Sequence, residues 1–315
     1  MNARGVMKPQ LVAMNRSRIG LLALAAAMLG ACADVTDEHA QGATFAVFPA
    51  TPGRHELGFL HDGVARSLIV YIPASYDPAV VRPLVVVLHG GGGSARGMFS
   101  AHPLEAYAES TGYLFVAAQG TAKPGGGNEW NGSAAFDTGV DDVGYLERVI
   151  VELSSALAID EHRRWMAGFS GGATMAVRFA TERSELLAAI GTFAGKVGRA
   201  EGTMPPFVFP PEPTTPLSVQ MTYGTEDPNF LGEIQGGSLS TSALEGMQWW
   251  ASALDCTAVP AVEVQGKLTF DTYTGCASGT VARMVTVQGM GHMWPDRSDG
   301  LDGTKLLLDF FEGKF

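Results

Sequence analysis

The stretch RRWMAGFSGGATMAVRFATE, residues 163–182, places a serine between a predicted strand and a predicted helix. Its centre, GFSGG (residues 168–172), is a G-x-S-x-G motif. A serine on such a sharp strand-to-helix turn has its hydroxyl exposed at the end of the strand, and its neighbours must be small because the turn leaves no room for side chains. Ser170 is therefore the candidate nucleophile. The amide of Gly171, at the start of the helix, is a candidate donor to an oxyanion.

A serine hydroxyl is a poor nucleophile without a base, so a histidine has to follow Ser170 if the chain uses the order serine, acid, histidine. Of the seven histidines, only His292 lies downstream of the motif, in the segment GMGHMWP (residues 289–295). The glycines there permit a loop that carries the imidazole over the serine; a surface histidine is the alternative. Activity should fall in acid, because only a neutral imidazole can accept the serine proton.

The acid that orients this histidine should end a strand between the two residues. The apolar strand LSVQMTY (residues 217–223) runs into Gly-Thr-Glu-Asp-Pro, so both Glu226 and Asp227 are candidates. We prefer Asp227 because the following proline stiffens the turn. Its role would be to hold the imidazole tautomer and to stabilise the imidazolium without taking the proton itself.

A second glycine-rich segment follows the Val/Leu-rich run PLVVVLH (residues 83–89), which reads as a buried parallel strand. The loop of four glycines after it can bring a backbone amide to an oxyanion, and we expect Gly91 to act there together with Gly171. A phosphate-binding loop is the rival interpretation. No Gly-Lys-Ser/Thr follows, and we do not expect a typical P-loop helix directly after the glycines.

Strand and helix patterns alternate along the chain, which favours an α/β fold with a mostly parallel sheet covered on both faces. An antiparallel hairpin at 56–73 enters this sheet, and a helix near 304–311 closes it. The acids Asp141 and Asp142 open a helix and are interpreted as caps rather than catalytic groups. The proline-rich segment 200–216 is expected to be a loop or lid edge. The other expected strands are 113–119, 164–169, 188–193 and 281–287, and the other expected helices are 103–110 and 171–182.

The N-terminal segment differs from the rest: basic residues precede an apolar run, and no acidic residue occurs before Ala33. This pattern predicts a signal peptide over 1–32 and export from the cytoplasm. The segment Leu-Gly-Ala-Cys ending at Cys32 resembles a lipobox, so we expect lipidation and a membrane tether through Cys32, with 33–41 as a flexible leash. Simple secretion, with Cys32 discarded, is the alternative. Residues 42–315 are expected to form a single catalytic domain.

Charge and cysteine content limit the function further. The formal net charge of −11 would repel polyanions, so we expect no nucleic-acid partner. In an oxidising compartment Cys256 and Cys276 should form a disulfide, which would stabilise the fold by about 3 kcal/mol in the chain-entropy model. Two free thiols are the alternative.

Aromatic residues near these motifs are candidates for the substrate cleft. Trp130 lies in the segment EWNG, and Trp294 follows the candidate base. Both are predicted to contact substrate, although core packing is the commoner role of tryptophan. Core packing is what we expect of the Trp249-Trp250 pair.

No metal or cofactor site is expected. The aspartates after the candidate base are spaced three apart, which does not match the alternate-residue pattern of a calcium-binding EF-hand loop, so a turn and a helix cap explain them better. These residues are Asp296, Asp299 and Asp302.

Together these motifs resemble the esterase family that contains polyhydroxybutyrate depolymerases and feruloyl or acetylxylan esterases, often grouped as carbohydrate esterase family 1. The resemblance implies an α/β-hydrolase fold and a cofactor-free acyl hydrolase, and it also points to Asp227 as the acid. It covers roughly 58–311. The matching segments are LHGGGG (88–93), EWNG (129–132), DDVGYL (141–146), the serine motif (168–172), YGTED (223–227), the cysteine pair and GMGHMWP (289–295).

The sequence also departs from that family. Extracellular polyester depolymerases usually carry a separate polymer-binding domain and often a cysteine where Gly91 stands, so an insoluble polymer is a less favoured substrate. We expect an exported serine esterase acting on small or oligomeric feruloyl, acetyl or short hydroxyalkanoate esters. The alternatives are a polyester depolymerase, an acyltransferase using a sugar or lipid acceptor, and a lipoprotein that binds a ligand without turnover.

Overall fold

The computed structural model describes residues 48, 50–133, 138–235, 237–295, 297 and 300–314. All of them belong to the compact unit Gly42–Phe315. The predicted signal peptide (1–32), Cys32, the leash (33–41), Asp296 and Asp299 lie outside the described residues.

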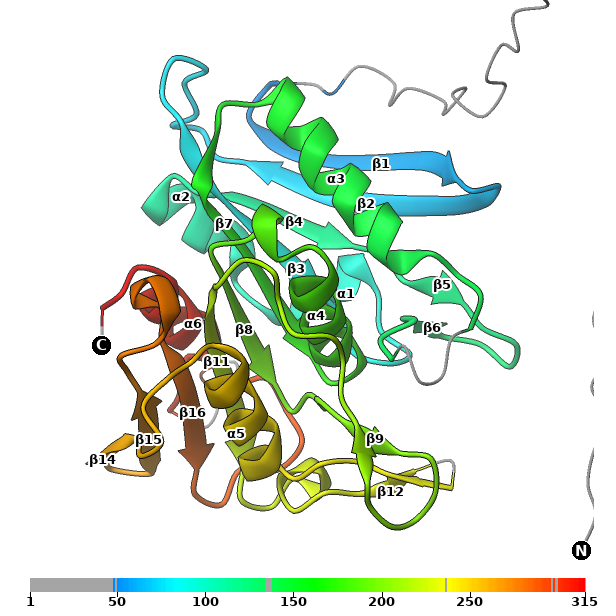
Figure 1. The fold of residues 1–315 in the computed structure, drawn as a ribbon. Helices are drawn as coiled ribbons and strands as arrows, with labels where there is room; N and C mark the ends of the chain where they lie inside the picture. The colour runs from blue at the N-terminus through cyan, green and yellow to red at the C-terminus, as the bar shows by residue number, and fades with distance from the viewer. Residues whose placement is uncertain are drawn as a thin grey trace, which may run out of the picture. The chain divides into compact units, whose positions relative to one another are not determined.

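A ten-stranded sheet organises this unit, in the spatial order β1-β2-β4-β3-β7-β8-β11-β16-β15-β14 (Figure 1). The six central strands, from β4 to β16, are parallel, and an antiparallel hairpin flanks them at each edge. This arrangement confirms the predicted α/β fold and the entry hairpin β1–β2. The strands are β1 (Gly53–His61), β2 (Val64–Ile72), β3 (Arg82–Leu88), β4 (Leu114–Ala118), β7 (Ile159–Phe169), β8 (Ala189–Phe193), β11 (Ser218–Gly224), β14 (Ala261–Gln265), β15 (Leu268–Tyr273) and β16 (Ala282–Val287).

Helices cover both faces of the sheet, and each face has its own apolar core. In β3, Leu84, Val86 and Leu88 belong to one core while Val85 and Val87 belong to the other, as the alternation of side chains along a strand requires. Buried residues of α3, α4 and α5 complete the first core, and those of α1, α2 and α6 complete the second. The helices are α1 (Ala95–Ala101), α2 (Leu104–Thr111), α3 (Asp142–Ala156), α4 (Gly171–Glu182), α5 (Ala243–Ala253) and α6 (Gly303–Phe311).

The two acids at the start of α3 have different roles. Asp141 is the expected N-cap, since its side chain accepts a hydrogen bond from the amide of Gly144. Asp142 is buried instead and forms an ion pair of 2.5 Å with Arg66 of β2, and its carboxylate also accepts a hydrogen bond from the amide of Asn131. The prediction that both acids are caps was therefore wrong for Asp142.

Several elements differ from the sequence predictions. The edge hairpin of β14 and β15 and the helix α5 were not predicted. A short helix, α1, does follow the glycine loop, and the Ser94 side chain caps it by accepting a hydrogen bond from the amide of Gly97. Within the proline-rich segment, β9 (Arg199–Ala200) pairs with β10 (Phe207–Val208). Two further small pairs are β5 (Thr121–Ala122) with β6 (Asn128–Glu129), and β12 (Ile234–Gln235) with β13 (Ser238–Leu239).

A disulfide joins Cys256 and Cys276, as expected. It ties the segment after α5 to the segment that leads from β15 into β16. At the start of the closing helix α6, Asp302 is the N-cap, accepting a hydrogen bond from the amide of Lys305. In the part of the chain that the structure describes, no helix is both long and apolar enough to cross a membrane.

Candidate active site

Ser170 occupies the sharp turn between β7 and α4. Its φ of 52° lies in the left-handed region, where residues other than glycine are uncommon, and its amide donates to the carbonyl of Phe193 in β8. A Cβ at Gly168 would lie 2.3 Å from the carbonyl oxygen of Gly172, and a Cβ at Gly172 would lie 2.4 Å from those of Leu88 and His89. The glycines of the motif therefore allow α4 to pack against the ends of the strands with the serine at the rim.

The base and the acid lie next to this serine. His292 Nε2 is 2.9 Å from Ser170 Oγ, and His292 Nδ1 is 3.0 and 3.1 Å from the two carboxylate oxygens of Asp227. The contacts are satisfied when Nδ1 carries the proton, because Nε2 can then accept the serine hydroxyl. The Asp227 carboxylate is fully buried and also accepts a hydrogen bond of 2.8 Å from the amide of Asn229. The structure thus brings the three predicted side chains together.

The geometry also separates the two candidate acids. Asp227 faces the imidazole, whereas Glu226 is exposed and uses only its amide, which donates to the carbonyl of Met290. The loop that carries His292 packs tightly here, because a Cβ at Gly224 would lie 1.8 Å from the Met290 carbonyl oxygen. A glycine at the end of β11 therefore lets this loop approach.

The two predicted oxyanion donors are neighbours. A Cβ built on Gly171 would lie 3.3 Å from the amide nitrogen of Gly91, so both backbones border the same small space beside Ser170. The buried ring of His89 holds the glycine loop in place. Its Nδ1 lies 2.8 Å from the carbonyl oxygen of Gly90, and its Nε2 accepts a hydrogen bond of 3.0 Å from the amide of Gly120. His89 is therefore a positioning residue that the sequence analysis did not identify.

The environment of His89 favours its neutral form. Burial lowers the pKa of His89 below its ordinary value of 6.5, although the hydrogen bond to the Gly90 carbonyl and the charge of Asp142 act in the opposite direction. A neutral ring with Nδ1 protonated can donate to Gly90 and accept from Gly120 at the same time. Its position in the segment His-Gly-Gly was the available sequence signal.

A pocket of about 330 Å³ opens at the serine, within the size range of small-ligand sites. Ser170, His292, Gly91 and Gly171 line it, and so does Trp130, whose indole N–H donates to the His89 carbonyl at 2.8 Å. The structure therefore places Trp130 in the pocket wall.

Trp294 lies elsewhere. It is buried in the core beside α6, with its ring 4.8 Å from those of Phe193 and His102. Its prediction as a substrate contact is corrected, because burial of a large apolar ring in the core decides its position. In the Trp249-Trp250 pair, Trp250 is fully buried, and Trp249 is half-buried and stacked on Phe209.

Most of the residues that line the pocket have polar side chains, which the sequence analysis did not predict. Lys196, from the loop after β8, and Arg199 form one wall with polar residues of the segment 229–235. Lys123 and Glu129 lie on the β5–β6 side, 3.7 Å apart and partly exposed. Apart from Glu129, which begins the segment EWNG, these residues belong to no recognised motif, so the topology of the fold was needed to bring them to the site.

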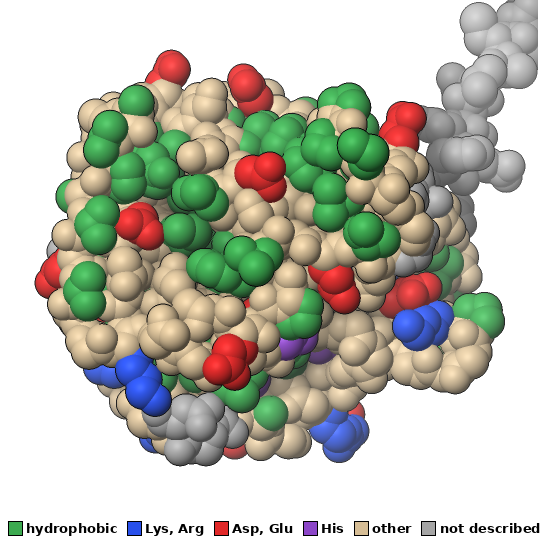
Figure 2. Space-filling model, turned by 90° about the horizontal axis from the view of Figure 1, so that it is seen from below, with side chains coloured by type: hydrophobic (Ala, Val, Ile, Leu, Met, Phe, Trp, Pro, Cys, Tyr) green, Lys and Arg blue, Asp and Glu red, His purple; other side chains and the backbone are tan. Residues whose placement is uncertain are grey.

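The pocket opens at the C-terminal ends of the parallel strands, toward which the arrowheads of β8 and β16 point in Figure 1. Figure 2 shows the unit from that side: hydrophobic side chains gather over its upper half, acidic side chains are scattered among them, and few lysines or arginines are visible. Histidine side chains are visible between their neighbours near the middle of this face.

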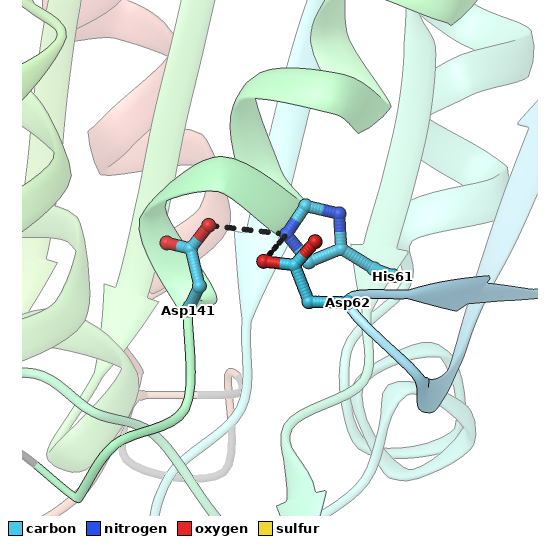
Figure 3. Close-up of side chains that lie close together, drawn as sticks. All are labelled: His61, Asp62 and Asp141. Atoms are coloured by element: carbon cyan, nitrogen blue, oxygen red, sulfur yellow. Dashed lines mark hydrogen bonds and ion pairs between the residues drawn. The ribbon is translucent and has the colours of Figure 1, made fainter. Parts of the chain in front are cut away.

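A separate group of His61, Asp62 and Asp141 resembles a set of metal ligands (Figure 3). Both carboxylates approach the same ring nitrogen, His61 Nε2, at 3.2 Å from Asp141 and 4.0 Å from Asp62. Asp141 is also engaged as the cap of α3. Hydrogen bonding and helix capping therefore account for this group without an ion.

This chain has the α/β-hydrolase fold, with Ser170, His292 and Asp227 brought together at the ends of its parallel strands. Among solved structures, the acetyl xylan esterase from Aspergillus awamori superposes with a TM-score of 0.58 at 15% sequence identity, covering 82% of this chain and 99% of that one. Such a likeness supports the fold.

Sequence comparisons agree with the predicted resemblance to esterases. NocK of Nocardia uniformis subsp. tsuyamanensis, whose name classes it as an esterase, is 32% identical over 151 residues, or 47% of this chain and 40% of that protein. Feruloyl esterase B of Piromyces equi is 25% identical over 249 residues, or 76% of this chain and 45% of that protein. The chain spans less than half the length of these two relatives. No protein-family model matches it.

Proposed function

We propose that this protein is an exported serine carboxylic-ester hydrolase. The observation that carries the proposal is the continuous set of contacts from Asp227 through His292 to Ser170, which opens on a pocket bordered by two backbone amides. A buried carboxylate, an oriented imidazole and a hydroxyl that lines a pocket are the groups that acyl transfer through an acyl-enzyme requires.

The proposed reaction has two halves. Ser170 Oγ attacks the ester carbonyl while its proton passes to His292 Nε2, and the oxyanion accepts hydrogen bonds from the amides of Gly91 and Gly171. The imidazolium then protonates the departing alcohol, leaving an acyl-enzyme. Water attacks this ester as His292 takes the water proton, and the protonated base returns it to Ser170 when the acid leaves. Asp227 stabilises the imidazolium throughout.

The proposed substrates are small or oligomeric feruloyl, acetyl or short hydroxyalkanoate esters. The similarity to a feruloyl esterase and the fold shared with an acetyl xylan esterase support this range. The predicted signal at 1–32 and the Cys256–Cys276 disulfide support export, and lipidation of Cys32 would add a membrane tether.

Labelling with a fluorophosphonate tests the nucleophile. Wild-type protein should be labelled at Ser170, and Ser170→Ala should lose both labelling and hydrolysis of p-nitrophenyl butyrate, whereas Ser155→Ala, at an exposed position on α3, should keep both. A panel of p-nitrophenyl acetate, methyl ferulate, acetylated xylan and hydroxybutyrate oligomers then ranks the substrates. Folded wild-type protein that is not labelled at Ser170 would refute the proposal.

A further inference from the structure

A second, smaller cavity adjoins the pocket at Ser170, and we call it the annex. Its volume is about 150 Å³, and Gly132 and Ser133 line both cavities, so the two meet at this segment. Most residues that line the pocket at Ser170 have polar side chains, whereas five of the eight that line the annex are valine, phenylalanine or proline. These five are Val177, Val197, Val208, Phe209 and Pro210.

Helix α4 borders both cavities and sets the distance between them. Thr174 lines the pocket one turn after Ser170, and Val177 lines the annex about one turn further on. At a rise of about 1.5 Å per residue, Val177 lies about 10 Å beyond Ser170 along the helix axis. The connecting segment lies directly on this helix, because a Cβ at Gly132 would lie 3.0 Å from the amide nitrogen of Met175. A group bound in the annex must therefore be joined to the ester by a chain that passes along α4.

Packing against α5 holds two of the apolar side chains of the annex in place. The ring of Phe209 stacks on that of Trp249, with the centroids 5.7 Å apart and an angle of 2° between the planes. The Phe209 ring also lies against the backbone of Gly198, where a Cβ would be 2.9 Å away. Val197 is 9% exposed, and a Cβ at Gly246 would lie 2.9 Å from its side chain. The annex therefore has a defined shape before a ligand enters.

The charged residue among the eight that line the annex is already paired. Arg178 Nε donates to Glu182 Oε1 at 2.8 Å, and Arg178 Nη1 donates to the carbonyl of Asn131 at 2.8 Å. An anionic occupant would compete with Glu182 for the guanidinium. An apolar occupant leaves this ion pair intact and removes apolar surface from water, so the chemistry of the lining favours an apolar group.

We propose that the annex binds the end of an unbranched alkyl chain carried by the substrate, so that the enzyme hydrolyses medium-chain esters in preference to short ones. This inference rests on the proposed hydrolase function and extends its substrate class. An apolar cavity of about 150 Å³ is large enough for benzene, so the annex holds about six carbon atoms. The carbons nearer the ester lie in the pocket and span the distance along α4. An alkyl chain on the acyl group or on the alcohol satisfies the same chemistry.

Esters that differ only in chain length test the proposal. One arm uses p-nitrophenyl esters from acetate to decanoate, and the other compares ethyl acetate with decyl acetate, all below their critical micelle concentrations. In the arm that responds, kcat/KM should change little while the chain ends in the polar pocket. It should then rise by about fourfold for each methylene that enters the annex, as burial of a methylene predicts. The responding arm identifies the side of the ester that carries the chain.

Two variants of the annex lining separate binding from a structural role. Val208→Asn adds a polar amide without a charge and should lower the long-chain to short-chain ratio of kcat/KM several-fold, with kcat/KM for the short ester near the wild-type value. Val177→Ala enlarges the annex and should shift the highest kcat/KM to a longer chain. The matched control, Val264→Asn at an exposed position of β14, should leave the ratio unchanged.

The inference would be overturned if kcat/KM did not rise with chain length in either arm. A wild-type ratio in Val208→Asn, whatever its activity, would also overturn it, since the effect of this residue would then be structural only. In each case continued hydrolysis of p-nitrophenyl butyrate, absent from Ser170→Ala, leaves the proposed function intact. Failure of the folded wild-type protein to hydrolyse any ester would instead refute the function itself.

Discussion

Replacing Asp227 by Asn removes one negative charge from the site while keeping the size of the side chain. The carboxylate is fully buried and accepts hydrogen bonds from His292 Nδ1 and from the amide of Asn229. Oδ1 accepts from both donors and Oδ2 lies 3.1 Å from Nδ1, so an asparagine that keeps its oxygen toward the Asn229 amide turns its NH₂ group toward His292 Nδ1. If that NH₂ faces His292, the imidazole must present an unprotonated Nδ1 and carry its proton on Nε2.

A proton on Nε2 prevents the imidazole from accepting the proton of Ser170. In a serine protease triad the same change lowers kcat by about 10⁴-fold, or about 5 kcal/mol of activation free energy, and we expect a similar loss here. The free energy of unfolding should change much less, because the volume of the side chain and at least one hydrogen bond are kept.

Steady-state hydrolysis of p-nitrophenyl butyrate measures the loss, and urea unfolding checks the fold. Glu226→Gln is the matched control: it removes the same charge one residue away, at an exposed side chain, and should keep kcat near the wild-type value. Our assignment would be refuted if Asp227→Asn stayed within tenfold of wild type, or if Glu226→Gln lost as much activity as Asp227→Asn.

Three further predictions concern stability. Because folding lowers the pKa of His89, the unfolded chain takes up a proton at this residue before the folded protein does as the pH falls below about 6.5, and the free energy of unfolding should drop by up to about 1.4 kcal/mol per pH unit. His89→Gln should remove this dependence in urea unfolding measured from pH 7 to 5. The same pH dependence in the wild type and the variant would contradict the assignment. Replacing Cys256 and Cys276 by serine should lower the free energy of unfolding by about 3 kcal/mol, seen as a lower Tm, and an unchanged Tm would contradict the bridge. Arg66→Met should lower the free energy of unfolding by about 3 to 5 kcal/mol, because it leaves the Asp142 carboxylate buried without its cation, and the double variant Arg66→Met/Asp142→Leu should lose less in the same urea unfolding experiment.

The parts of the fold that the sequence predicted well are those with strong local signals. The turn at Ser170 could be recognised because its glycines, its preceding strand and its following helix are contiguous in the chain. The central strands have uninterrupted apolar runs, as in PLVVVLH (83–89), whereas every residue of β14 (Ala261–Gln265) is exposed and offers no such run. The edge hairpin was missed for that reason, although Gly266 between two β-rich segments was a usable turn signal.

The site was only partly predictable because its wall depends on tertiary structure. His292 and Asp227 could be chosen by their order after the serine and by the loops that follow predicted strands. Lys196 and Glu233 come from loops on either side of β11, and nothing in their local sequence indicates that they meet. Trp294 shows the opposite case, since proximity to the base in sequence did not place it in the pocket.

Because Gly224 lies close to the Met290 carbonyl, position 224 should not accept other residues, whereas positions in the pocket wall can be varied. A saturation library at 224 should return glycine alone among active clones, because any side chain there displaces the loop of the base. A library over 196, 199, 233 and 235 alters recognition without touching that contact. Directed evolution of new specificities from this scaffold should therefore succeed by changing the charged residues of the pocket wall while Gly224 is kept.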